Sequence, residues 1–381
     1  MKKLFYLVGF VLTILAVYVS FFSPSTTIVS PLGVGHSSPP KKTDNSRYVI
    51  MGFAPYWNIK KISPTSLQTI THFAYFHLLL NADGSIYTKV NKKSEDPGYT
   101  NYKRLISGDI DYDDKPLILT FMPESQTALV SMIASDSSRQ QTISTITKTM
   151  NDSGASGVNI DFEPVGDISP SSRENFTRFI QELRVSIPKP SLLSISVYAS
   201  AASRPRLWDL PKLSPTTDYF VVMTYDYTMP ASTSAGPNAP LRGSGDLFEH
   251  DIIKNIAEIT KVIPSNQILL GIPFYGYEWD TVDATKYSPA DSKGSVASLE
   301  RIQKMIDEKS LELIWDRNSL TPYGVSSESG KISQIYFENE TSIKLKLEFV
   351  KSAGLGGIAI WALGYEGNTP WIWPTISGLN H

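Results

Sequence analysis

Short runs of β-branched and aromatic residues recur eight times between residues 48 and 364, and helical patterns separate several of them. The helical patterns include "RENFTRFIQELRVS" (173–186) and "DIIKNIAEITKV" (251–262). Eight strands alternating with helices favour a parallel α/β barrel of the TIM (β/α)8 type, whose site lies at the carboxyl ends of the strands. We therefore expect one barrel over residues 48–381. The expected strands are 48–57, 71–80, 115–122, 157–164, 191–199, 218–227, 267–276 and 356–364.

The interval between the seventh and eighth expected strands is much longer than the others. It contains a helical pattern at 296–308 and strand-like runs at "LELIWD" (311–316) and "KISQIYF" (331–337). Such a mixture predicts a small α+β insertion, at about residues 280–355, on the rim of the barrel.

The N-terminus has a different composition. After Lys2 and Lys3, residues 4–22 ("LFYLVGFVLTILAVYVSFF") carry no charge, and roughly 20 apolar residues span a bilayer. We expect residues 1–22 to be an uncleaved signal anchor or a cleaved signal peptide, with a buried soluble helix as a third reading. Residues 23–47, rich in Ser, Pro, Thr and Lys, are expected to be a flexible linker. The barrel would then lie on the extracellular face of the membrane, or be secreted.

The overall composition excludes several classes of protein. The net charge is −2, which gives no sign of a nucleic-acid partner. The chain has no Cys and 5 His, so disulfides and Cys-based zinc sites are excluded and a His-rich metal site is not expected. We expect no cofactor and no metal, and a monomer.

The fourth expected strand, "GVNIDFEPV" (157–165), places polar residues where a barrel strand is normally apolar. Successive side chains alternate across a strand, so Asn159, Asp161 and Glu163 share one face. A second carboxylate in a partly desolvated mouth raises the pKa of its neighbour, and a Glu kept protonated can act as a general acid. The alternative is a strand-end salt-bridge pair, although this stretch contains no Lys or Arg.

Other expected strands also end in polar or aromatic residues. The first ends at Tyr56 and Trp57, the sixth carries Tyr225 and Asp226, and the eighth carries Trp361. Each of these residues could instead have only a structural role: the Asp could cap the next loop, and the aromatic residues could belong to the core. Together, aromatic side chains around carboxylates suit sugar rings, whose apolar faces stack on aromatic rings.

These motifs resemble the active-site strands of glycoside hydrolase family 18, the chitinases and related N-acetylglucosaminidases. "SGVNIDFE" resembles the fourth strand of that family, "MTYDY" the sixth, "GIPFYGYEW" the seventh and "GIAIWALGYE" the eighth. The resemblance extends from about Tyr48 to Glu366. Within the family, the sequence looks most like the bacterial branch that includes spore-cortex and cell-wall N-acetylglucosaminidases.

The resemblance implies a retaining, substrate-assisted hydrolysis of β-1,4-linked N-acetylglucosamine polymers through an oxazolinium ion. Glu163 would be the acid and base, Asp161 would orient the substrate acetamide, and Tyr225 would donate to its oxygen. The expected substrate-binding residues are Asn159, Met223, Asp226, Trp361, Tyr56, Trp57, Phe76 and Tyr275.

The chain departs from the family pattern at two positions of the fourth strand. Ser156 and Asn159 stand where Asp is often found, and we expect Asn159 to hydrogen-bond Asp161. The third strand ends in "LTFMPESQ" without the Gly-Gly often present there.

Two other functions remain open from the sequence. A non-catalytic lectin on the same barrel would bind the oligosaccharide without cleaving it, and an anchored structural or adaptor domain would do neither. The substrate is equally open between chitin and peptidoglycan.

Overall fold

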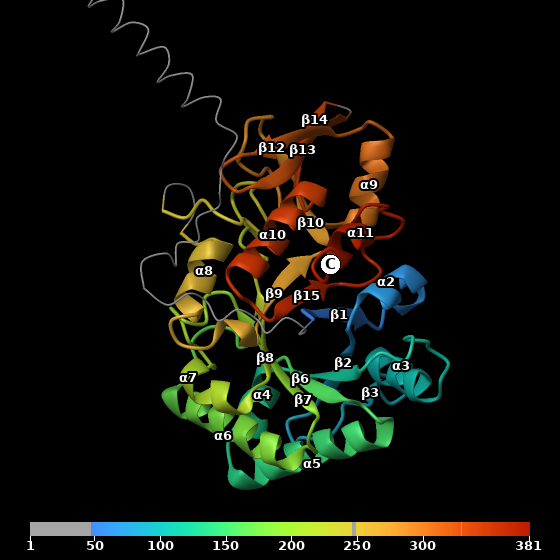
Figure 1. Cartoon of the computed structure of the whole chain (residues 1–381), viewed down its shortest axis with the longest axis vertical. Helices are drawn as coiled ribbons and strands as arrows, with labels where there is room; N and C mark the ends of the chain where they lie inside the picture. Colours follow the sequence, from blue (N-terminus) through green and yellow to red (C-terminus); the bar gives the residue numbers. More distant parts are fainter. Residues whose placement is uncertain (1–46, 246–248, 329) are drawn as a thin grey trace, which may run out of the picture. The chain divides into compact units, whose positions relative to one another are not determined.

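The computed structural model describes residues 47–245, 249–328 and 330–381. Within them, eight strands pair in parallel and close into a barrel in the order β1-β15-β9-β8-β7-β6-β5-β2 (Figure 1). This is the expected TIM-type barrel. Its strands are β1 (Val49–Pro55), β2 (His72–Leu80), β5 (Leu117–Pro123), β6 (Gly157–Ile160), β7 (Leu192–Tyr198), β8 (Tyr219–Met223), β9 (Ile268–Pro273) and β15 (Gly357–Trp361).

Helices follow the barrel strands, and most begin at a Ser, Asp or Asn whose side chain accepts a hydrogen bond from the first turn. The described α-helices outside the insertion are α2 (Pro64–Thr69), α3 (Pro97–Ile106), α4 (Gln126–Ile133), α5 (Asp136–Ser153), α6 (Pro170–Ser186), α7 (Leu210–Leu213), α8 (Ile252–Ile259), α10 (Glu340–Ser352) and α11 (Ile372–Ser377). Short 3₁₀ turns are η1 (Ile59–Lys61), η2 (Ser214–Thr216) and η3 (Ser265–Gln267), and a small hairpin joins β3 (Lys89–Asn91) to β4 (Ser94–Glu95).

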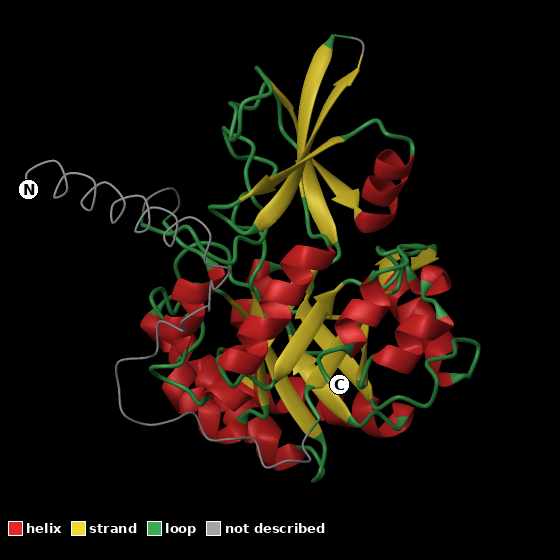
Figure 2. Ribbon diagram, turned by 45° about the horizontal axis from the view of Figure 1, so that its top comes forward, coloured by secondary structure: helices red, strands yellow, loops and turns green. Residues whose placement is uncertain are grey.

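A second, antiparallel sheet is inserted between β9 and α10, and both sheets can be followed as yellow arrows in Figure 2. Its order is β11-β10-β14-β13-β12, and helix α9 accompanies it. The insertion begins earlier than expected because β10 follows β9 after Phe274 alone, so the two strands read as one run. Its elements are β10 (Tyr275–Thr281), β11 (Ser295–Ser298), α9 (Leu299–Asp307), β12 (Glu312–Asp316), β13 (Thr321–Glu328) and β14 (Lys331–Tyr336).

Strand β6 shows how the sequence pattern divides the core. Val158 and Ile160 point outward and pack with Phe162 beneath α6, where the Phe162 and Phe179 rings stack with centroids 5.6 Å apart. Asn159 points the other way, toward β7, and is fully buried. Gly157 allows β7 to approach closely, because a Cβ there would lie 2.4 Å from the Leu192 carbonyl oxygen. The expected alternation of faces is therefore present.

Two expected strands are shorter in the structure, and their functional candidates lie in the loops that follow. β6 ends at Ile160, although the Asp161 N–H still donates to the Phe121 carbonyl oxygen at 3.0 Å. β8 ends at Met223, and Asp226 adopts the left-handed conformation with φ of 62°. The chain turns at these points, so the side chains are presented at the carboxyl ends of the strands.

The first described residues lie next to the C-terminus in space. The Tyr48 N–H donates to Asn380 Oδ1 at 2.7 Å, and Asn380 Nδ2 donates back to the Tyr48 carbonyl oxygen at 3.2 Å. No helix within the described residues is long and apolar enough to cross a membrane. The predictions for residues 1–22, and for all but the last residue of 23–47, lie outside the described residues.

Candidate active site

Asp161 and Glu163 lie just beyond the carboxyl end of β6. Burial raises the pKa of Asp161 well above its usual value, the charge of Glu163 raises it further, and the Ser196 hydroxyl lowers it in part. Burial also raises the pKa of Glu163, a hydrogen bond from Tyr198 lowers it, and the charge of Asp226 raises it. Asp161 Oδ1 is buried and has no hydrogen-bond partner among the described residues. Glu163 is therefore a carboxyl that can hold a proton, and Asp161 offers an oxygen that can accept a hydrogen bond from a ligand.

Asn159 lies below this pair and is held by two serines of β7. Asn159 Nδ2 donates to Ser196 Oγ at 3.0 Å, and Ser194 Oγ donates to Asn159 Oδ1 at 2.8 Å. The structure shows no hydrogen bond from Asn159 to Asp161 among the described residues; the amide is bonded across to β7 instead. Ser196 instead lies between the two residues as the hydroxyl that affects Asp161.

Tyr225 and Asp226 follow β8, and strand β10 of the insertion holds them. Tyr275 and Tyr277 donate to Asp226 Oδ1 at 2.5 and 2.8 Å, and the Asp226 N–H donates to Asn238 Oδ1 at 2.8 Å. Burial raises the pKa of Asp226, and the two phenol hydrogen bonds lower it. The Tyr225 and Tyr275 rings contact edge to face with centroids 6.1 Å apart.

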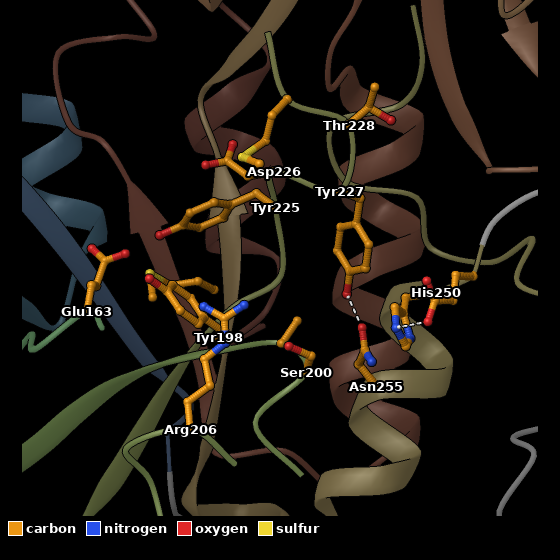
Figure 3. Close-up of a pocket in the computed structure, with 14 residues that line it drawn as sticks. Glu163, Tyr198, Ser200, Arg206, Tyr225, Asp226, Tyr227, Thr228, His250 and Asn255 are labelled. Atoms are coloured by element: carbon orange, nitrogen blue, oxygen red, sulfur yellow. Dashed lines mark hydrogen bonds and ion pairs between the residues drawn. The ribbon is translucent and has the colours of Figure 1, made fainter. Parts of the chain in front are cut away.

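Glu163, Tyr225 and Asp226 line a pocket of about 590 Å³, whereas Asp161 is not among its lining residues (Figure 3). Figure 3 shows Glu163 on one side of the pocket and Tyr225 and Asp226 across from it, with Arg206 below them. His250 and Asn255 form the far end. The described residues that line it are Glu163, Tyr198, Ala199, Ser200, Arg206, Met223, Tyr225, Asp226, Tyr227, Thr228, Met229, Glu249, His250 and Asn255.

Four of the predicted aromatic residues gather within β2, at the end of β15 and just after β1. The Phe76 and Trp361 rings have centroids 4.5 Å apart, and Trp57 contacts Trp361 at 6.4 Å and Phe76 at 6.0 Å. Trp57 is 47% exposed, and Tyr56 packs edge to face against it at 4.9 Å. Because β15 lies opposite β6 in the barrel order, this cluster faces the carboxyl pair across the mouth.

A family model agrees with this arrangement. The model described as glycosyl hydrolases family 18 matches residues 49–366. This chain belongs to family 18 of the glycosyl hydrolases. The family expected from the strand motifs is therefore confirmed.

Individual relatives of this family 18 chain are distant. The cortical fragment-lytic enzyme of Bacillus anthracis is 25% identical over 244 residues, which cover 62% of this chain and 53% of that protein. The probable endochitinase of Caenorhabditis elegans is 24% identical over 328 residues, which cover 78% of this chain and 51% of that protein. The chain thus spans about half the length of the curated relatives it matches.

Solved structures share the fold. The class V chitinase from Nicotiana tobaccum superposes with a TM-score of 0.75 at 20% identity, covering 87% of this chain and 99% of that one. The chitinase from Chromobacterium violaceum superposes with a TM-score of 0.68 at 23% identity, covering 88% and 99%.

The family 18 site also contains residues that the sequence did not single out. Tyr198 ends β7, so the same strand-end argument that selected Glu163 could have found it. Tyr277 lies in β10, whose existence was not predicted. Arg206 lies in the loop after β7, and no local pattern marks it. Its guanidinium lies 5.0 Å from the centre of the Tyr198 ring.

Proposed function

We propose that this family 18 chain hydrolyses β-1,4-linked N-acetylglucosamine polysaccharide with retention, using the substrate's own acetamide as the nucleophile. The observation that carries the proposal is the buried carboxyl pair at the mouth of the barrel: Asp161 Oδ1 has no hydrogen-bond partner in the described part of the chain, and the pKa of the neighbouring Glu163 is raised. A glycoside of an N-acetyl sugar supplies an amide N–H that Asp161 can accept and a glycosidic oxygen that Glu163 can protonate.

Glu163 serves as the proton donor. It protonates the glycosidic oxygen while the acetamide carbonyl oxygen attacks the anomeric carbon, and the bond to the leaving sugar breaks. The resulting oxazolinium ion is opened by water, whose proton returns to Glu163. Two inversions at the anomeric carbon give net retention.

Asp161 and Tyr225 act on the acetamide. The free Oδ1 of Asp161 accepts the acetamide N–H, which becomes more acidic as the ring closes, so the ionised carboxylate stabilises the cation. Tyr225 donates its hydroxyl to the acetamide oxygen. Asn159 is a positioning residue, because its contacts are with Ser194 and Ser196 of β7.

The remaining predicted residues hold the sugar on the non-reducing side of the bond. Trp361 forms the floor, and Asp226 and Met223 contact the ring from β8. Trp57 and Phe76, with Tyr56 behind them, extend the apolar wall, because all three lie within the aromatic cluster around Trp361. Tyr275 acts through Asp226, to which its hydroxyl is bonded.

The test uses the full chain and a fluorogenic chitobiose or chitotriose glycoside. Loss of the general acid in Glu163→Gln should lower kcat/KM by about 100-fold or more. Glu340→Gln is the matched control, because Glu340 is an exposed glutamate paired with Lys344 on α10. It should retain full activity.

The other outcomes separate the alternatives. If wild type binds chito-oligosaccharides without cleaving them, and Glu163→Gln binds equally well, the protein is a lectin. If Glu163→Gln cleaves as fast as wild type, the assignment of the acid is wrong.

The proposal also places the barrel outside the cytoplasm as a monomer, tethered or released according to whether residues 4–22 are cleaved. Lys2 and Lys3 before that uncharged run support this orientation. Membrane fractionation with N-terminal sequencing of the product checks it, and recovery of the intact chain in the cytoplasm would contradict it.

A further inference from the structure

Arg206 gives the proposed catalytic pocket a fixed positive charge. Glu163, Asp226 and Glu249 also line the pocket, and Arg206 is the one Arg or Lys among its described lining residues. An arginine remains charged at any physiological pH. The described residues place no carboxylate within ion-pair distance of Arg206, whereas Glu249 pairs with His250 at 3.2 Å.

The guanidinium is held in place while most of its hydrogen-bonding capacity stays free. Its Cζ lies over the Tyr198 ring, 5.0 Å from the ring centroid, and Nη1 donates to the Pro164 carbonyl oxygen over a long 3.4 Å. Nε is buried without a partner among the described residues. An arginine has five N–H donors arranged for two-point binding of a carboxylate, so one long bond leaves this capacity largely unused.

The backbone at this position is also fixed. Arg206 has a positive φ of 43°, which non-glycine residues seldom adopt, and its carbonyl oxygen accepts a 2.6 Å hydrogen bond from Arg173 Nε of α6. Such a conformation persists where the surroundings enforce it, and it is found disproportionately at functional sites. The cation is therefore directed into the pocket by the fold.

Its position relative to Glu163 identifies the sugar it would meet. The aromatic cluster around Trp361 lies opposite β6, whereas Tyr198 ends β7, the neighbour of β6, and Arg206 lies in the loop that follows β7. If the sugar that is attacked stacks on Trp361, the leaving sugar lies on the Arg206 side of Glu163. Figure 3 shows Arg206 and Tyr198 beside Glu163 in this part of the pocket.

We propose that Arg206 selects a substrate whose leaving sugar carries a carboxylate, namely an N-acetylmuramic acid residue with its lactyl group on O3. This inference rests on the proposed function and specifies its substrate class. In such a glycan the broken bond is at O4 of the leaving sugar, so the substituent on the adjacent O3 lies next to the oxygen that Glu163 protonates. Chitin has a neutral hydroxyl at that position and leaves Arg206 unpaired.

The test compares three substrates with the full chain. They are a glycan of alternating N-acetylglucosamine and N-acetylmuramic acid with free lactyl carboxylates, the same glycan with those carboxylates converted to amides, and a chito-oligosaccharide of equal length. Wild type should favour the free acid over the amide by about 10- to 100-fold in kcat/KM, since a charge-assisted two-point contact is lost. That preference should decline as salt is raised.

Variants assign the preference to Arg206. Arg206→Gln should bring the acid-to-amide ratio to within about threefold of one, and Arg206→Lys should give an intermediate ratio. Arg204→Gln is the matched control, because Arg204 is 63% exposed and pairs with Asp167 at 3.5 Å. It should keep the wild-type ratio.

Two results overturn the proposal: an acid-to-amide ratio near one in wild type, which requires no variant, or equal losses on all three substrates in Arg206→Gln. Failure of the proposed function would be distinct, since wild type would then cleave none of the three.

Discussion

Asp161 and Glu163 are two residues apart but have different surroundings. Asp161 is 4% exposed and influenced by Ser196, whereas Glu163 reaches the pocket and is influenced by Tyr198 and Asp226. Both pKa values are raised, and a bound acetamide N–H would favour the ionised form of Asp161 alone. Substrate binding therefore drives the two carboxyls toward the different protonation states that the mechanism requires.

Replacing Asn159 by Asp tests this balance. A further carboxyl at 159 would add negative charge beside Asp161 and compete for the Ser196 hydroxyl, and both effects raise the pKa of Asp161. Because the reaction needs Asp161 ionised, the acidic limb of the pH profile of kcat/KM should move to higher pH.

Ser196→Ala is the companion variant to Asn159→Asp. This variant removes the hydroxyl without adding charge. It should also move the acidic limb of the kcat/KM profile to higher pH, by a smaller amount than Asn159→Asp does. Superimposable profiles for wild type and Asn159→Asp would show that the two positions are not coupled.

At this scale the sequence identifies residues that alternate on a strand or stand at its end. Asp161, Glu163 and Asp226 were found in that way, and the structure brings them together. Arg206 was not found, because its role depends on a loop conformation and on stacking over Tyr198, and neither leaves a periodic signal.

Strand β10 links the insertion to the barrel. It supplies the hydroxyls of Tyr275 and Tyr277 to Asp226, while Tyr275 also packs on Tyr225. The insertion therefore affects the charge state of a residue that follows β8, in addition to forming a wall.

Tyr277→Phe measures this link. The Tyr277 hydroxyl lowers the pKa of Asp226, so its removal should raise that pKa. Asp226 would then take up a proton at higher pH, and the rise in KM on the acid side should begin at a higher pH than in wild type.

Tyr323→Phe is the matched control, since Tyr323 lies in the same aromatic cluster and the structure shows no hydrogen bond from it to Asp226. A shift as large in the control as in Tyr277→Phe would assign the effect to packing.

Element boundaries were less predictable than element types. The sequence placed helix α9 and strands β12 and β14, but the run at 267–276 joined β9 to β10, and β13 ("TPYGVSSE") contains a Pro and a Gly that weaken any strand pattern. Strands β6 and β8 end at Ile160 and Met223, the last residues that pair with β7, whereas the expected strands ran on to residues 164 and 227.

At the scale of the whole molecule, the barrel makes one mouth from residues distant in the sequence. Trp361 of β15 and Glu163 after β6 come from opposite strands, and Asp226 lies on a third side. The strand count and the carboxyl-end rule predicted this gathering. They did not predict the pocket over β7, because its lining comes from loops whose course depends on tertiary contacts.

The central claim is that the substrate's acetamide is the nucleophile at this mouth. Proton NMR of chitotetraose cleavage, recorded before the new reducing end equilibrates, tests it directly. Retention predicts that the first product formed is the β-anomer, and a glycoside lacking the 2-acetamido group should not be cleaved. An initial α-anomer, or cleavage of the glycoside without the acetamide, would contradict the account.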